Sequence, residues 1–105
     1  MIHPAPTVTL SGPSLAVAGE IDADSVIALR ARGEQLIRQA TGPLTVDLSE
    51  LASAHSVVLS MLLCWQRQAQ QIERPLTFRG ASSELLSLAA LSNLQKEIPG
   101  FAPHG

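Results

Sequence analysis

The chain is poor in aromatic residues, with one tryptophan, two phenylalanines and no tyrosine among 105 residues. Base-stacking platforms for nucleic acids and aromatic-lined ligand pockets both depend on such side chains, so we expect neither. The net charge is slightly negative, at -2, whereas proteins that bind nucleic acids usually present a basic face. The composition therefore predicts no nucleic-acid partner.

Cysteine and long apolar runs are scarce as well. The single cysteine, Cys64, excludes an intramolecular disulfide. No apolar run approaches the roughly 20 residues that a membrane-spanning helix needs. Residues 1–6 lack the charged and apolar regions of a secretory signal. We therefore expect a soluble, cytoplasmic protein.

Residues that could support catalysis or bind a metal are equally sparse. His3 and His104 lie in the two tails and show no metal-ligand spacing. The sequence contains no glycine-rich phosphate loop and no nucleophile elbow. We expect no metal, no cofactor and no enzymatic activity. His55 has no evident nucleophile or acid in its neighbourhood, which favours packing at the surface or in an interface over proton transfer.

What the chain does have is enough apolar content for one core, since 46% of its residues are hydrophobic. This length and composition predict a single domain over residues 7–101, with a flexible tail at residues 1–6 and another at 102–105.

Hydrophobic periodicity and turn-forming residues predict the helices and strands of that domain. Alternating or apolar runs indicate strands at residues 7–10, 15–19, 44–48 and 76–78. Between the second and third strands, helical spacing predicts an amphipathic helix of about 16 residues, with Asp22 or Asp24 as its N-cap. A second helix is expected at residues 56–71, and a third follows a cap at Ser82 or Ser83. The order β-β-α-β-α-β-α predicts an α/β fold, a small mixed sheet with helices on one side.

The second helix is unusually apolar. Eight of the nine residues from Val57 to Trp65 are apolar, the exception being Ser60. A helix that is apolar on nearly all sides must be covered on nearly all sides, and a chain this short covers only part of it. We therefore expect another protein to cover the rest. Two stripes could face the sheet, and the sequence does not choose between Val58, Leu62, Trp65 and Ala69 on one side and Val57, Met61 and Cys64 on the other.

Ser56 stands at the start of this helix, and three roles remain open for it. Its hydroxyl could cap the helix by accepting a backbone N–H, it could contact a partner, or it could be a phosphoacceptor. We expect a partner-binding surface around it, completed by the start of the first helix. That surface consists of His55, Ser56, Val57, Val58, Ser60, Met61, Cys64, Ser25, Val26 and Arg30.

A small acidic cluster precedes the first helix. Glu20, Asp22 and Asp24 could form an acid–base pair, but solvated loop positions and N-capping are the commoner roles. Together with Asp47 they are expected to border the Ser56 loop, because both loops should follow strands at the same edge of the sheet.

The pattern resembles the STAS domain, the fold of anti-sigma-factor antagonists. Residues Gly19-Glu20-Ile21-Asp22 are similar to the family's Gly-Glu-Leu-Asp turn, and Val46-Asp47-Leu48-Ser49 to its third strand. Ser56, followed three residues later by Leu59, stands where the family carries its phosphorylatable Ser or Thr. The resemblance implies a STAS-like fold.

A narrower resemblance covers residues 10–99 and is to the MlaB subfamily. Its features are a Leu-rich second helix, then a Thr-Leu-x-Gly strand end, Leu-Ala-x-Leu and Asn-Leu. Here they read Leu59 to Leu63, Thr77-Phe78-Arg79-Gly80, Leu88-Ala89-Ala90-Leu91 and Asn93-Leu94.

The MlaB resemblance implies a non-catalytic subunit that binds and supports the cytoplasmic ATPase of an ABC transporter. That transporter moves phospholipid between the two membranes of Gram-negative bacteria and so maintains outer-membrane lipid asymmetry. The protein would lie at the inner face of the inner membrane, in contact with the membrane only through its partner. An exposed apolar stripe would also allow self-association when the domain is alone.

The alternative is an anti-sigma-factor antagonist that is regulated by phosphorylation of Ser56. Two departures from the general STAS pattern count against it. His55 replaces an acidic residue, and Val57-Val58 replaces a pair of small residues. Neither departure damages a static docking role, because two valines enlarge the apolar contact.

Overall fold

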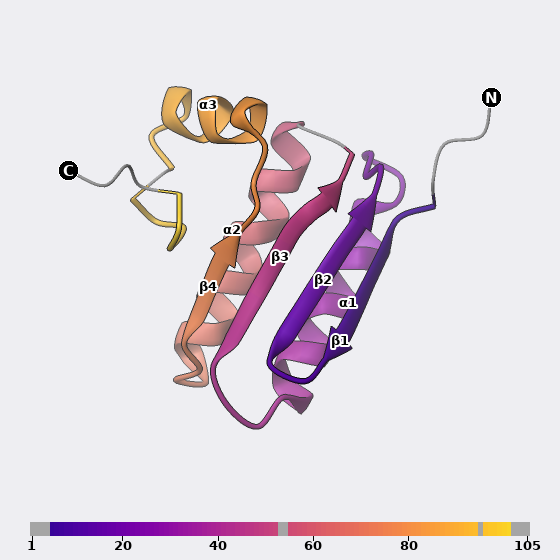
Figure 1. Ribbon diagram of the computed structural model, residues 1–105, viewed down its shortest axis with the longest axis vertical. Helices are drawn as coiled ribbons and strands as arrows, with labels where there is room; N and C mark the ends of the chain where they lie inside the picture. The colour runs from indigo at the N-terminus through magenta and orange to yellow at the C-terminus, as the bar shows by residue number, and fades with distance from the viewer. Residues whose placement is uncertain (1–4, 53–54, 95, 102–105) are drawn as a thin grey trace.

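The computed structural model describes residues 5–52, 55–94 and 96–101. Its elements follow the predicted order (Figure 1). They are β1 (Thr7–Ser11), β2 (Ser14–Gly19), α1 (Val26–Gln39), β3 (Leu44–Leu51), α2 (Ser56–Gln71), β4 (Leu76–Arg79) and α3 (Ser83–Leu91).

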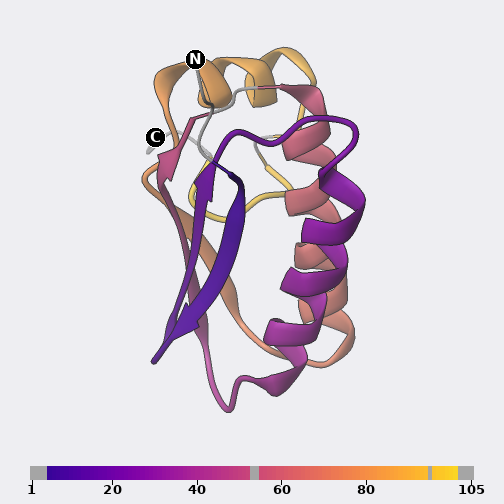
Figure 2. The same ribbon diagram turned by 90° about the vertical axis from the view of Figure 1, so that its right-hand side faces the viewer.

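The four strands form one mixed sheet in the order β1-β2-β3-β4. β1 and β2 make an antiparallel hairpin, whereas β2 pairs with β3 and β3 with β4 in parallel. The parallel pairs follow from the helices between those strands, since a crossover helix returns the chain to the same end of the sheet. Both long helices lie against one face of the sheet (Figure 2). The predicted α/β architecture is therefore confirmed.

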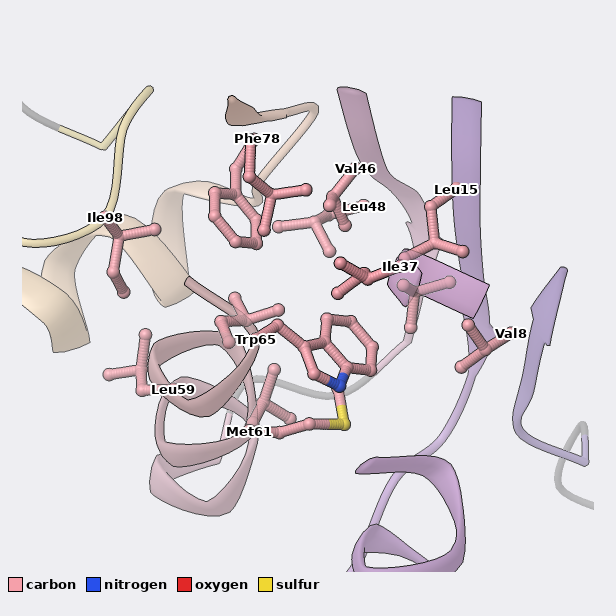
Figure 3. Packing of buried hydrophobic residues seen from close by; sticks show 14 of the residues in the cluster. Val8, Leu15, Ile37, Val46, Leu48, Leu59, Met61, Trp65, Phe78 and Ile98 are labelled. Carbon is pink, nitrogen blue, oxygen red and sulfur yellow. The ribbon is translucent and has the colours of Figure 1, made fainter. Parts of the chain in front are cut away.

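The core lies between the sheet and these helices. Alternate residues of the strands, among them Leu15, Val17, Val46 and Leu48, are buried there, as expected for a sheet covered on one face. Figure 3 shows the indole of Trp65 and the side chains around it filling the space between helices and strands.

The α2 helix buries most of its apolar side chains inside the domain itself. The stripe that faces the core consists of Val58, Leu62, Trp65 and Ala69, all fully buried. Met61, a member of the other stripe, is buried as well. Val57, Leu63 and Cys64 are half-buried. The apolar surplus of this helix is thus smaller than its sequence suggests, because α1 and the C-terminal segment cover two of its sides.

The C-terminal segment packs beside β4. The backbone N–H of Phe78 donates to the carbonyl of Pro99 (2.9 Å), and the rings of Phe78 and Phe101 meet edge to face with centroids 6.2 Å apart. Ile98 and Phe101 are buried. This segment therefore covers the outer edge of β4 and belongs to the core.

The starts of α3 and α1 compare differently with the prediction. Ser82 caps α3 as expected, because its Oγ accepts the backbone N–H of Leu85 (3.1 Å). The N-cap of α1 is Ser25, not Asp22 or Asp24, and the helix has 14 residues. A turn at residues 23–25 separates Asp22 from the helix, and Asp24 lies within that turn.

Candidate functional site

An apolar groove of about 220 Å³ runs between α1 and α2. Six of its seven lining residues belong to the partner-binding surface predicted from the sequence. The lining consists of Val26, Ile27 and Arg30 from α1 and of Val57, Ser60, Met61 and Cys64 from α2. Ile27 was not predicted, yet it is the most exposed of the apolar lining residues, at 70%.

The walls of the groove are held together by side chains of α2 and the turn after it. The indole Nε1 of Trp65 donates to the carbonyl of Arg30 (3.0 Å), and the amide of Gln68 donates to the carbonyl of Glu34 (2.9 Å). Arg74 donates through Nε to the carbonyl of Ile37 (2.8 Å). These bonds span about two turns of α1, so the groove is already formed in the isolated chain.

The chemistry of the groove is apolar with one charge. Arg30 is the charged residue of the lining; its Nε lies 3.5 Å from a carboxylate oxygen of Glu34, and its side chain is 51% exposed. Ser60 turns its hydroxyl inward to its own helix and donates to the carbonyl of Ser56 (3.3 Å). Such a lining suits shape-complementary contact with an apolar side chain of another protein.

His55 and Ser56 are both exposed at the start of α2. His55 occupies the N-cap position, with no side-chain capping bond, and Ser56 is the first residue of the helix. The hypothesis that Ser56 caps the helix is therefore wrong. Its hydroxyl belongs to the molecular surface at the head of α2. The preceding residues 53–54 lie outside the described part of the chain.

Val58 does not belong to the partner-binding surface on which it was expected. Its side chain is 0% exposed within the domain. It packs in the core beneath α2 and cannot contact a partner. The following turn of the helix places Met61 at the bottom of the groove, where it is buried but still part of the lining.

The acidic loop before α1 is organised by Asp22. One of its carboxylate oxygens accepts the backbone N–H groups of Ser25 (2.9 Å) and Asp24 (3.0 Å) and the hydroxyl of Ser25 (3.0 Å). The N–H and hydroxyl of Ser25 hold the pKa of Asp22 below its ordinary value. Glu20 is half-buried and Asp24 exposed. The loop touches the next one, since Ala52 N donates to the carbonyl of Gly19 (2.8 Å).

Asp47 does not join this cluster. Its neighbours Val46 and Leu48 point into the core, so Asp47 points to the opposite, helix-free face of the sheet. There it accepts the backbone N–H of Ser49 (3.0 Å) and pairs with Arg79 (3.5 Å). The Ser49 N–H, with the Ser49 hydroxyl and Arg79, lowers the pKa of Asp47. The expectation that Asp47 borders the Ser56 loop is wrong.

A second hollow, of about 370 Å³, lies between α2 and the C-terminal segment. Most of its lining is polar or charged, with both signs present, and it consists of Leu63, Gln66, Arg67, Gln70, Lys96, Glu97 and Pro99. It is larger than the α1–α2 groove, but its mixed lining does not single out a ligand class. The groove is therefore the better candidate for a functional surface.

Within residues 5–52, 55–94 and 96–101, no group of three or more His, Cys, Asp or Glu side chains could hold a metal ion. Over the same residues, no helix combines the length and apolar character needed to cross a membrane.

A protein-family model described as "Mlab, STAS domain" matches residues 6–100. No curated protein matches the chain significantly.

Several solved structures share the fold. The unphosphorylated form of the anti-sigma factor antagonist SpoIIAA superposes with a TM-score of 0.70 at 17% identity, over 95% of this chain and 90% of that one. The phosphorylated form of SpoIIAA, a cell fate determinant of Bacillus, gives 0.66 at 17% identity, over 95% and 93%. An anti-sigma factor antagonist from Mycobacterium paratuberculosis gives 0.60 at 22% identity, over 94% and 86%. At these identities the likeness is one of fold.

Proposed function

Because the chain belongs to the STAS domain family described as Mlab, we propose that it is a non-catalytic subunit of a phospholipid-transport ABC transporter. In this role it binds the transporter's cytoplasmic ATPase subunit and supports its activity. The protein then resides in the cytoplasm of a Gram-negative bacterium, at the inner face of the inner membrane. It reaches the membrane only through its partner.

The observation that carries this proposal is the preformed apolar groove between α1 and α2. Its rim exposes Ile27 and half-exposes Val57 and Cys64, and burial of such apolar surface drives association. A specific interface buries about 1,200–2,000 Å² in total, which is more than one groove supplies. The contact therefore extends over His55 and Ser56 at the head of α2, and over the loop that leads into α1.

A binding subunit of this kind influences its partner by binding one of the partner's conformations more tightly than another. If the ATPase exposes a surface that fits the groove better in one conformation, binding shifts the ATPase toward that conformation. The shift is limited to the difference in affinity for the two states. ATP hydrolysis stays entirely with the partner, and this chain transfers no chemical group.

Co-purification with the ATPase tests the docking surface. Val57→Asp places a charge at the rim of the groove, and Ser56→Glu places one at the head of α2, where the helix N-terminus tolerates a negative charge. Both variants should keep the far-ultraviolet circular dichroism of the wild type and lose the ATPase.

Leu91→Asp is the matched control, because Leu91 is 85% exposed and lies outside the groove. This variant should co-purify normally. If Val57→Asp and Ser56→Glu also co-purify at wild-type levels, the groove is not the docking site.

A second candidate function is an anti-sigma-factor antagonist switched by a serine kinase. The exposed hydroxyl of Ser56, which the helix does not use for capping, supports it. The identity of His55 and Val57 counts against it, as above. Intact mass after incubation with cell extract and ATP separates the two functions. A stoichiometric phosphate on Ser56 favours the antagonist, and its absence favours the transporter subunit.

A further inference from the structure

The charges around the α1–α2 groove are unevenly distributed along α1. The loop before α1 carries the carboxylates of Asp22 and Asp24, and hydrogen bonds favour the charged form of Asp22. Arg30 lies one helical turn beyond Val26, within the groove lining. A partner that follows the groove along α1 therefore meets negative charge at one end and a positive charge further on.

Arg30 is placed to make an intermolecular contact in addition to its contact with Glu34. A guanidinium carries five N–H donors, and the Glu34 contact is made through Nε. The side chain is 51% exposed. Its remaining donors suit a carboxylate, which accepts two parallel hydrogen bonds from arginine.

The groove also restricts the backbone form of its occupant. An extended peptide gains affinity chiefly through main-chain hydrogen bonds to a sheet edge. The walls here are two helices, whose backbone groups beyond the first turn are bonded within each helix, so the groove has no strand edge to which an extended peptide could bond. An amphipathic helix instead inserts side chains spaced three or four residues apart into an apolar groove.

From this arrangement we propose that the occupant is an amphipathic helix of the ATPase with a defined charge order. The inference rests on the docking function proposed above. An apolar side chain of that helix lies between Ile27 and Val57, a carboxylate lies opposite Arg30, and a basic residue lies opposite the Asp22–Asp24 loop. The apolar anchor supplies affinity, and the charges fix the direction in which the helix lies, since charge complementarity sets register more than affinity.

Binding kinetics of charge-reversed variants test the charge order. Arg30→Glu and Asp24→Lys should each lower the association rate constant and raise Kd for the ATPase about tenfold at low salt. Both effects should shrink as salt rises, because salt screens charges across a rim.

Arg32→Glu is the matched control. It makes the same change in net charge at an exposed residue two positions along α1, about 200° around the helix from Arg30. This variant should bind within about twofold of the wild type. If Arg30→Glu and Arg32→Glu behave alike, only net charge matters and the proposal is overturned.

A photo-crosslinking amino acid at position 27 identifies the occupant directly. The crosslinked segment of the ATPase should have apolar residues at helical spacing. An acidic residue should lie on one side of its apolar anchor and a basic residue on the other. Changing that acidic residue to arginine should restore binding of Arg30→Glu. A crosslink to a second copy of this chain, or to a peptide without the acidic residue, overturns the proposal while the docking function stands. Failure of the wild type to bind the ATPase overturns the docking function itself.

Discussion

The indole ring of Trp65 lies directly against the α carbon of Gly33, so that a Cβ on residue 33 would overlap the ring. The same indole donates its N–H to the carbonyl of Arg30, one turn earlier on α1. Glycine within a helix normally costs about 0.5–1 kcal/mol relative to alanine. Here it lets α1 approach α2 closely, and this approach sets the width of the groove that both helices line.

The first prediction concerns this contact. In an exposed helix, Gly33→Ala would stabilise the protein by about 1 kcal/mol through helix propensity. Against the rigid indole the added methyl group must displace one helix, and overpacking of a core costs about 1–3 kcal/mol. We expect overpacking to win and the free energy of unfolding to fall by at least about 1 kcal/mol in urea denaturation.

Gly42→Ala is the control for that experiment. A Cβ at Gly42 would meet nothing within 4 Å, so the substitution should leave stability unchanged or raise it slightly. Equal stability of Gly33→Ala and the wild type would show that the two helices are free to move apart.

Much of the architecture could be predicted because its signals are local. The bounds of the second helix, Ser56 to Gln71, match α2, although Ser56 is its first residue and not its cap. The cap of the third helix was expected at Ser82 or Ser83, from their place before an apolar run, and it is Ser82. The parallel pairing of β2, β3 and β4 follows from the alternation of strands and helices.

The errors concern how elements are rotated against each other. Whether Val58 or Met61 faces outward depends on how α2 is rotated about its axis. The contact between Trp65 and Gly33 sets that rotation, and these two residues lie 32 positions apart in the sequence. Ile27 was overlooked because it lies off the apolar stripe of its helix. That position was itself the available signal, since an isoleucine outside the stripe must be exposed. For Asp47, the alternation of Val46 and Leu48 already indicated the outer face.

The second prediction concerns the C-terminal segment. Phe101 is buried and packs its ring edge to face on Phe78. Phe101→Ala should therefore lower the free energy of unfolding by about 3 kcal/mol, as is typical of a truncated core phenylalanine. Leu91→Ala removes a side chain that is 85% exposed and should change stability by less than about 0.5 kcal/mol. A cost below about 1 kcal/mol for Phe101→Ala would mean that the segment is not part of the core.

The third prediction is a pH dependence at Asp22. Folding lowers the pKa of this carboxyl, chiefly through the backbone N–H of Ser25, so its ionised form stabilises the folded state. That stabilisation is complete above the unfolded pKa, about 3.9, and is lost as the pH falls through the lower folded value. Asp22→Asn keeps an acceptor oxygen without the charge.

The stability difference between the wild type and Asp22→Asn should accordingly be constant at pH 6–7 and shrink as the pH falls below about 4. Urea denaturation across this range measures it. Asp24→Asn controls for the loss of a charge in the loop. It removes the Asp24 carboxylate but keeps the backbone N–H that Asp24 donates to Asp22. A difference that grows on acidification would contradict the assigned role of Asp22.

The last prediction compares two serines at the starts of two helices. Ser82 Oγ accepts the N–H of Leu85 and caps α3, so Ser82→Ala should cost about 1 kcal/mol of stability. Ser56 is already inside α2, and the N-cap position belongs to His55. Ser56→Ala should therefore change the free energy of unfolding by less than about 0.5 kcal/mol. Paired denaturation of the two variants measures the contrast. A cost at Ser56 equal to that at Ser82 would restore the capping role, whereas an unchanged stability accompanied by weaker ATPase binding would assign the Ser56 hydroxyl to the interface.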